Sequence, residues 1–147
     1  MIATHSTVTA TVEDLWMTLT DLAGYARWNP FIIAAAGDVR VGERLDLIIL
    51  PPGGRATASR PWVTAVEPPR YLEWMGRALL PGVFDGRHSF TLTALPGGRT
   101  LVQQAGTFTG LMVPFAEGVL NRTRAGFATM NEALTRHAQA ETAPDSS

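Results

Sequence analysis

Histidines are the side chains in this sequence that could transfer a proton near neutral pH, and the chain contains three of them. His88 lies in an alternating segment between Gly86 and Phe90, at a position that shares their apolar parity. A histidine there could act as a general acid or base, or could donate a hydrogen bond to a ligand carbonyl. The position also suits a histidine that packs in the core, and the sequence leaves both interpretations open.

The other two histidines, His5 and His137, are scattered along the chain and make no recognisable metal-ligand set with His88. We therefore expect no metal site, and we expect surface or packing roles for these two side chains. The chain has no cysteine, which excludes disulfides, thiolate catalysis and cysteine-based metal sites.

Motifs for nucleophilic catalysis and phosphate binding do not occur either. The sequence contains no Gly-x-Ser-x-Gly word. Its Gly-rich segments at 51–55 and 96–99 lack the spacing and the following lysine of a phosphate-binding loop, so we interpret them as turns. The sequence thus predicts neither a catalytic triad nor a bound cofactor.

Composition indicates an ordinary globular domain, with 46% hydrophobic and 17% charged residues. The net charge of −1 argues against a nucleic-acid partner, because phosphate binding relies on clustered positive charge. The N-terminal residues do not resemble a signal peptide, and no apolar run reaches the roughly 18 residues of a membrane span. We expect a cytoplasmic protein.

Hydrophobic periodicity and turn residues divide most of the chain into short elements. Helices are predicted at residues 12–20 and 22–27, and strands at residues 2–10, 31–39, 43–50, 56–67, 70–77, 83–95 and 99–109.

From about Pro114, apolar or small side chains recur at spacings of three and four residues. This pattern predicts a helix of about 24 residues and roughly 36 Å, which is long enough to cross a small domain. Residues 140–147 are small and polar, so we predict a disordered tail there and a single domain over residues 1–139.

Grouped strands with one long helix are typical of the α+β class. The sheet must cover its apolar face, and the last helix is the only element of sufficient length. We therefore predict a helix-grip fold, in which a curved antiparallel sheet of six to seven strands surrounds the C-terminal helix. Two short helices follow the first strand.

A curved sheet does not close tightly along the whole helix, so we predict an apolar cavity between them. Alternatively, the same side chains could pack as a full core. Strand alternation and helical spacing place a common set of residues toward this space. They are Trp74, Gly76, His88, Phe90, Gln104 and Phe108 from the strands, and Phe115, Val119, Thr123, Phe127 and Met130 from the helix.

Four sequence segments carry a family resemblance. They are residues 10–16 (ATVEDLW), 19–31 with LTDL and WNPF, 71–90 with YLEW and GVFDGRHSF, and 98–111 with GRT and TFTGL. Together they resemble the START-related SRPBCC superfamily, which includes polyketide cyclases and the Bet v 1-like pollen allergens. The resemblance spans residues 2 to about 138 and implies the helix-grip fold. Members often carry an acidic residue two positions before the Phe-x-Gly word, where this chain has Gly106.

Three hypotheses for function remain open, because members of the superfamily include lipid carriers, hormone receptors, cyclases and chaperone activators. The first is binding of a hydrophobic or aromatic small molecule, lipid-like or polyketide-like, oriented by His88, Gln104 and Arg77. The second is a cyclase or dehydratase-type enzyme that uses His88 for proton transfer. The third is an interaction module, such as a chaperone activator or a homodimer without a ligand.

Overall fold

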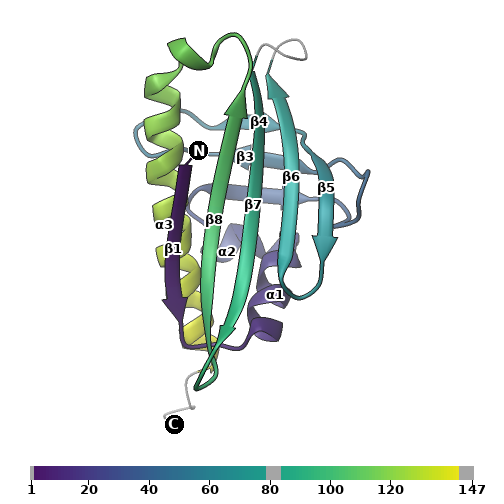
Figure 1. Ribbon diagram of the computed structural model, residues 1–147, viewed down its shortest axis with the longest axis vertical. Coiled ribbons are helices and arrows are strands. Elements are labelled where there is room, and N and C mark those ends of the chain that lie inside the picture. Colours follow the sequence, from purple (N-terminus) through teal and green to yellow (C-terminus); the bar gives the residue numbers. More distant parts are fainter. Residues whose placement is uncertain (1, 79–83, 143–147) are drawn as a thin grey trace.

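A computed structural model of the chain describes residues 2–78 and 84–142, and its elements follow the predicted order (Figure 1). The helices are α1 (Val12–Thr20), α2 (Tyr25–Trp28) and α3 (Glu117–Thr142), with short 3-10 turns η1 (Leu22–Gly24) and η2 (Val113–Phe115). The strands are β1 (Ile2–Val8), β2 (Ile32–Ala36), β3 (Asp46–Ile49), β4 (Thr57–Ser59), β5 (Trp62–Glu67), β6 (Tyr71–Ala78), β7 (Phe84–Leu95) and β8 (Arg99–Thr109).

The short helices begin and end at polar residues that bind the backbone. The hydroxyl of Thr11 accepts a hydrogen bond from the Asp14 amide and caps α1. The side-chain carbonyl of Asn29 accepts from the amides of Phe31 and Ile32, both at 2.9 Å. This turn ends α2 and directs the chain into β2.

The strands form two antiparallel sheets rather than one. Five of them follow the order β1-β8-β7-β6-β5, and β2-β3-β4 form a second sheet. The predicted strand at 56–67 is divided at Arg60 and Pro61, so the described part of the chain has eight strands. Proline cannot donate to a sheet hydrogen bond, which explains the break. A bridge between Arg44 and Trp62 still connects the two sheets.

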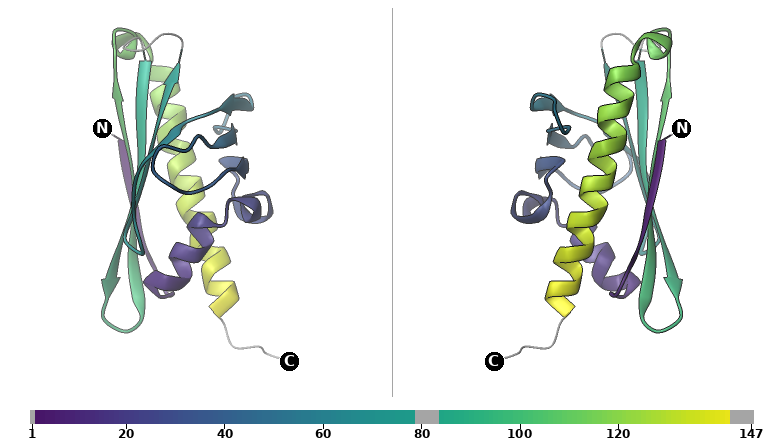
Figure 2. Two further views of the ribbon diagram at one scale, coloured as in Figure 1. Left: turned by 90° about the vertical axis from the view of Figure 1, so that its right-hand side faces the viewer. Right: turned by 90° about the vertical axis from the view of Figure 1, so that its left-hand side faces the viewer.

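Helix α3 lies along the inner side of the five-stranded sheet, beside the edge strand β1 (Figures 1 and 2). The three-stranded sheet runs across behind the long strands, so sheet and helix together surround one interior (Figure 2). This arrangement is the predicted α+β helix-grip fold. The helix continues to Thr142, past the predicted start of a tail at Ala140; residues 143–147 lie outside the described residues.

One glycine of α3 marks its closest approach to the rest of the molecule. Gly126 is buried, and a Cβ atom added there would overlap the ring of Phe31. Phe31 also packs edge-on against Phe127, with ring centroids 5.9 Å apart. The small residue therefore allows the middle of α3 to rest on the chain that enters β2.

We expect Gly126→Ala to lower the free energy of unfolding by about 1–3 kcal/mol, because the added methyl group has no space. The matched control is Gly118→Ala in the same helix, where the nearest atom is the Arg122 guanidinium at 3.7 Å. The control should gain up to about 1 kcal/mol, since alanine is the better helix former. Urea denaturation of both variants checks the prediction. Stabilisation by both substitutions would contradict the close packing.

Candidate functional site

The inner face of the five-stranded sheet is arranged in rows that cross β6, β7 and β8. Strand register aligns Leu72 with Phe90 and Gln104 in one row. The next row consists of Trp74, His88 and Gly106, and the one after it of Gly76, Gly86 and Phe108. The inner-face parity predicted from strand alternation therefore holds for all three strands.

A chain of polar side chains crosses this otherwise apolar interior from the sheet to the helix. Nε2 of His88 lies 2.9 Å from Oε1 of Gln104. Nε2 of Gln104 donates to Oδ1 of Asn131 at 2.7 Å and to the backbone carbonyl of Phe127 at 3.2 Å. Asn131 in turn donates to the carbonyl of Val102 at 3.4 Å. Gln104 and Asn131 are both buried, so these bonds satisfy groups that water does not reach.

Aromatic rings enclose His88. Its imidazole stacks with Phe127 at 4.4 Å and with Phe90 at 4.5 Å between ring centroids, and it meets Trp74 edge-on at 5.1 Å. Burial among these rings lowers the pKa of His88 to about 4, although the hydrogen bond with Gln104 acts in the opposite direction. The imidazole is therefore neutral at pH 7.

Burial of the inner face decreases toward the upper end of the molecule, where α3 begins. Along α3, Met130 is fully buried, Phe127 is 2% exposed and Val119 is 47% exposed. The strands follow the same gradient, because Phe90 and Gln104 are fully buried whereas Gly86 and Phe108 are partly exposed. His88 lies at the boundary and keeps part of its surface exposed. The lower interior is thus a packed core, and the side chains toward the upper end are less completely buried.

Two glycines let aromatic rings lie against the sheet at this boundary. A Cβ atom at Gly106 would approach the Phe127 ring to 3.0 Å, and one at Gly86 would approach Phe108 equally closely. Gly76 differs, because its nearest neighbours there would be Ser59 at 3.7 Å and Pro61 at 3.8 Å, which is ordinary contact. Space for an added side chain therefore remains beside Gly76.

Most predicted inner-face residues come together here, but with different degrees of burial. Trp74, Phe90, Gln104, Phe127 and Met130 belong to the packed part, and Gly76, His88, Phe108, Val119 and Thr123 to the partly exposed part. The side chain of Phe115 lies outside the described residues. That any of them contacts a ligand stays a prediction.

Arg77 does not lie where the ligand hypothesis placed it. Its guanidinium is 5.3 Å from the ring centroid of Trp62 and 3.8 Å from the Asp85 carboxylate. Arg77 lies three residues after Trp74 in β6, and successive side chains of a strand point to opposite faces, so Arg77 points to the outer face.

Sequence reasoning missed Asn131, which lies four residues after Phe127 and therefore on the same helix face.

A second polar cluster lies on the outer face and is internally satisfied. The Glu73 carboxylate accepts hydrogen bonds from Tyr71 at 2.6 Å, Thr64 at 2.7 Å and Arg87 at 2.8 Å. Partial burial raises the pKa of Glu73, but these bonds outweigh burial and hold it below its ordinary value. The cluster stabilises the pairing of β5, β6 and β7 and presents no free group.

Two surface grooves lie away from this interior. One, of about 480 Å³, lies between α1 and the end of α3 and includes Met17, Trp28 and His137. Trp28 stacks on His137 there, at 5.8 Å between centroids. The other, of about 560 Å³, includes Glu13, Arg70 and Tyr71.

Within the described residues, no three histidine or acidic side chains gather as metal ligands.

Comparison with known proteins assigns the family. The sequence profile described as polyketide cyclase/dehydrase and lipid transport matches residues 2–140, nearly the whole chain. This chain belongs to the polyketide cyclase/dehydrase and lipid transport family. A comparison with curated proteins gave no match.

Solved structures show that this family member shares its fold with START-like proteins. The Zhui aromatase/cyclase from Streptomyces sp. R1128 is similar with a TM-score of 0.79 at 16% identity, covering 97% of this chain and 95% of that one. A START superfamily protein from Mycobacterium smegmatis has a TM-score of 0.73 at 19% identity, and the match covers 96% of this chain and 98% of that one. A point mutant of Thalictrum flavum norcoclaurine synthase, in complex with a transition-state analogue, has a TM-score of 0.74 at 16% identity. The match covers 97% of this chain and 95% of that one.

None of the helices in the described part of this family member combines the length and apolar character that a membrane crossing requires.

We expect the buried imidazole to make folding of this family member pH-dependent. His88 has a pKa of about 4 in the folded state against an ordinary value of 6.5. Between these values only the unfolded chain takes up the proton, so stability is retained above pH 6.5 and falls as the pH decreases toward 4. The loss amounts to at most about 3 kcal/mol.

Denaturation of wild type and His88→Phe at pH 7 and pH 4.5 measures this effect, since the variant cannot titrate at position 88. The variant should lose less stability on acidification than wild type. His5→Gln, on the exposed face of β1, should behave like wild type. An equal acid sensitivity of all three proteins would contradict a neutral His88.

Proposed function

We propose that this protein binds a hydrophobic or aromatic small molecule at the open upper end of the space between the sheet and α3. The observation that supports this most strongly is the gradient of burial on the inner face. Along α3, exposure rises from 2% at Phe127 to 47% at Val119, and Leu120 packs against the core while only partly buried. The inner-face residue Phe108 is partly exposed as well. Apolar side chains that face inward and remain exposed favour an apolar ligand.

The open space has a defined floor. Trp74, His88 and Phe127 lie at its lower boundary, and the Phe108 ring lies close to Gly86 and Gly106 of β7 and β8. Flat aromatic surfaces of this kind suit a planar ligand. If a ligand buried about 200 Å² of apolar surface there, transfer from water would contribute roughly 5 kcal/mol.

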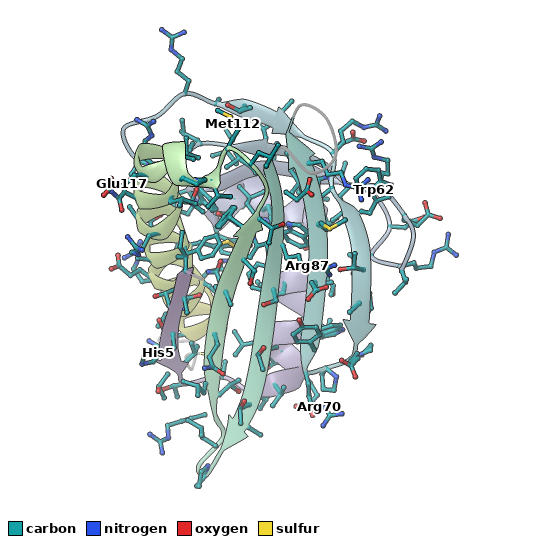
Figure 3. The ribbon with its side chains drawn as sticks, turned by 45° about the horizontal axis from the view of Figure 1, so that its top comes forward. His5, Trp62, Arg70, Arg87, Met112 and Glu117 are labelled. Carbon is teal, nitrogen blue, oxygen red and sulfur yellow. The ribbon has the colours of Figure 1, made fainter. Side chains whose placement is uncertain are left out.

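At the upper end, exposed apolar residues continue outside the space. Leu111 is 79% and Met112 is 44% exposed, just before α3 begins. Figure 3 shows Met112 and Glu117 at this end of the molecule. An apolar rim beside the opening would ease the entry of a poorly soluble molecule.

The relatives point in the same direction. The family description names polyketide cyclase/dehydrase activity and lipid transport, and both involve largely apolar molecules. Among the similar structures are an aromatase/cyclase and a norcoclaurine synthase with a bound analogue. A cyclase or dehydratase reaction is the second candidate, and His88 would be its base. We rank binding first, because a histidine with a pKa near 4 is a weak base at pH 7.

Filling the space beside Gly76 tests the proposal. We expect Gly76→Leu to fold normally, because leucine suits a strand and its Cβ meets only ordinary contacts. Its affinity for a fluorescent apolar probe such as 1-anilinonaphthalene-8-sulfonate or N-phenyl-1-naphthylamine should fall at least about tenfold, equivalent to 1.4 kcal/mol. Titration of probe fluorescence measures this.

The matched control is Ala3→Leu, which adds a side chain of the same kind at an exposed position of β1. It should bind the probe like wild type. Saturable binding that Gly76→Leu leaves unchanged would place the probe elsewhere. A wild-type protein that shows no saturable binding of either probe would refute the binding function and favour the interaction-module alternative.

A further inference from the structure

We infer from the hydrogen-bond geometry that the site selects ligands which donate a hydrogen bond to Nδ1 of His88, namely phenols and enols, over ethers and carboxylates. This inference rests on the proposed function and specifies its ligand class. It follows from the direction of every hydrogen bond in the polar chain between β7 and α3.

The orientation of Gln104 is fixed by a backbone group. The Phe127 carbonyl can only accept, so the Gln104 atom 3.2 Å from it is the amide nitrogen. The other end of the same side chain, its carbonyl oxygen, therefore faces His88.

Asn131 supports this assignment independently. The Val102 carbonyl can also only accept, which turns the Asn131 amide nitrogen toward it and the Asn131 oxygen toward Gln104. Reversing Gln104 would place its oxygen 2.7 Å from the Asn131 oxygen and 3.2 Å from the Phe127 carbonyl oxygen, with no hydrogen between them. Two backbone carbonyls thus exclude the flipped arrangement that a side-chain amide would otherwise allow.

His88 must then donate its Nε2 hydrogen to Gln104. Burial keeps the imidazole neutral, so Nδ1 carries a lone pair and no proton. Within the part of the chain that the structure describes, Gln104 is the hydrogen-bond partner of His88, the residue as a whole is partly exposed, and Nδ1 is not among the fully buried side-chain atoms that lack a partner. The polar feature offered to a ligand is an acceptor, which reverses the earlier expectation that His88 donates to a ligand carbonyl.

Charge distribution opposes anionic ligands. All twelve arginines of the chain are exposed, and the chain contains no lysine. A carboxylate at the floor would face the Nδ1 lone pair with no cation to compensate for its lost hydration. A neutral hydroxyl can instead donate to Nδ1 while its rings contact Phe108 and Phe127.

Three naphthalene probes of nearly equal size separate these possibilities at pH 7. They are 2-naphthol, a neutral donor; 2-methoxynaphthalene, which has no donor; and 2-naphthoate, an anion. We expect wild type to bind 2-naphthol at least about tenfold more tightly than either of the others, by fluorescence or calorimetric titration. His88→Phe should lower the affinity for 2-naphthol to that for 2-methoxynaphthalene, and His5→Phe should leave the preference unchanged.

A second measurement does not depend on ligand binding or on a variant that folds. Long-range ¹H–¹⁵N correlation spectra of wild type identify which imidazole nitrogen carries the proton, and His88 should be the Nε2–H tautomer. A proton on Nδ1, or equal affinity for the three probes, overturns the inference while leaving the binding function intact. Absence of binding for every probe refutes the proposed function and this inference with it.

Discussion

The interior of this protein depends on one buried amide. Gln104 lies on β8, between the edge strand β1 and β7, and its side chain binds the backbone of α3 at Phe127 and the side chain of Asn131. An unsatisfied amide in this position would cost roughly 1–3 kcal/mol. The bonds therefore fix the rotation of α3 about its axis relative to β8, and that rotation decides which helix residues face the sheet. Phe127 and Met130 are among them, and Leu120 packs against the same core farther up.

The same amide determines the chemical character of His88. Surrounded by Trp74, Phe90 and Phe127, the imidazole is too poorly hydrated to hold a charge, and Gln104 accepts its one proton. A histidine in this condition differs from an exposed one, because it offers a lone pair and resists protonation. The surroundings of His88 are thus apolar and uncharged, and the imidazole has its proton on the side of Gln104 and its lone pair on the other nitrogen.

Glycines on the inner face of the sheet accompany the lower burial at the upper end. The inward rows at that end place Gly106 beside His88, and Gly76 and Gly86 in line with Phe108, so the sheet carries few side chains there. Aromatic rings lie 3.0 Å from the Cβ positions at Gly86 and Gly106, whereas the atoms nearest to that position at Gly76 belong to Ser59 and Pro61 at ordinary contact distance. The lower half, by contrast, is filled by residues such as Leu72, Leu92 and Leu134. The tightly packed residues and the less buried residues therefore lie at opposite ends of one interface.

The sequence by itself determined the order of the elements, the inner parity of β6, β7 and β8, and the family, because strand alternation and helical spacing are local properties. It could not place the break at Pro61 between two sheets, or the outward direction of Arg77 against Trp62, since both depend on partners distant in the chain. It also could not find Asn131, choose the tautomer of His88 or show which residues of the inner face are fully buried and which are partly exposed. These properties arise from contacts between β7, β8 and α3, which only the tertiary structure brings within hydrogen-bonding distance.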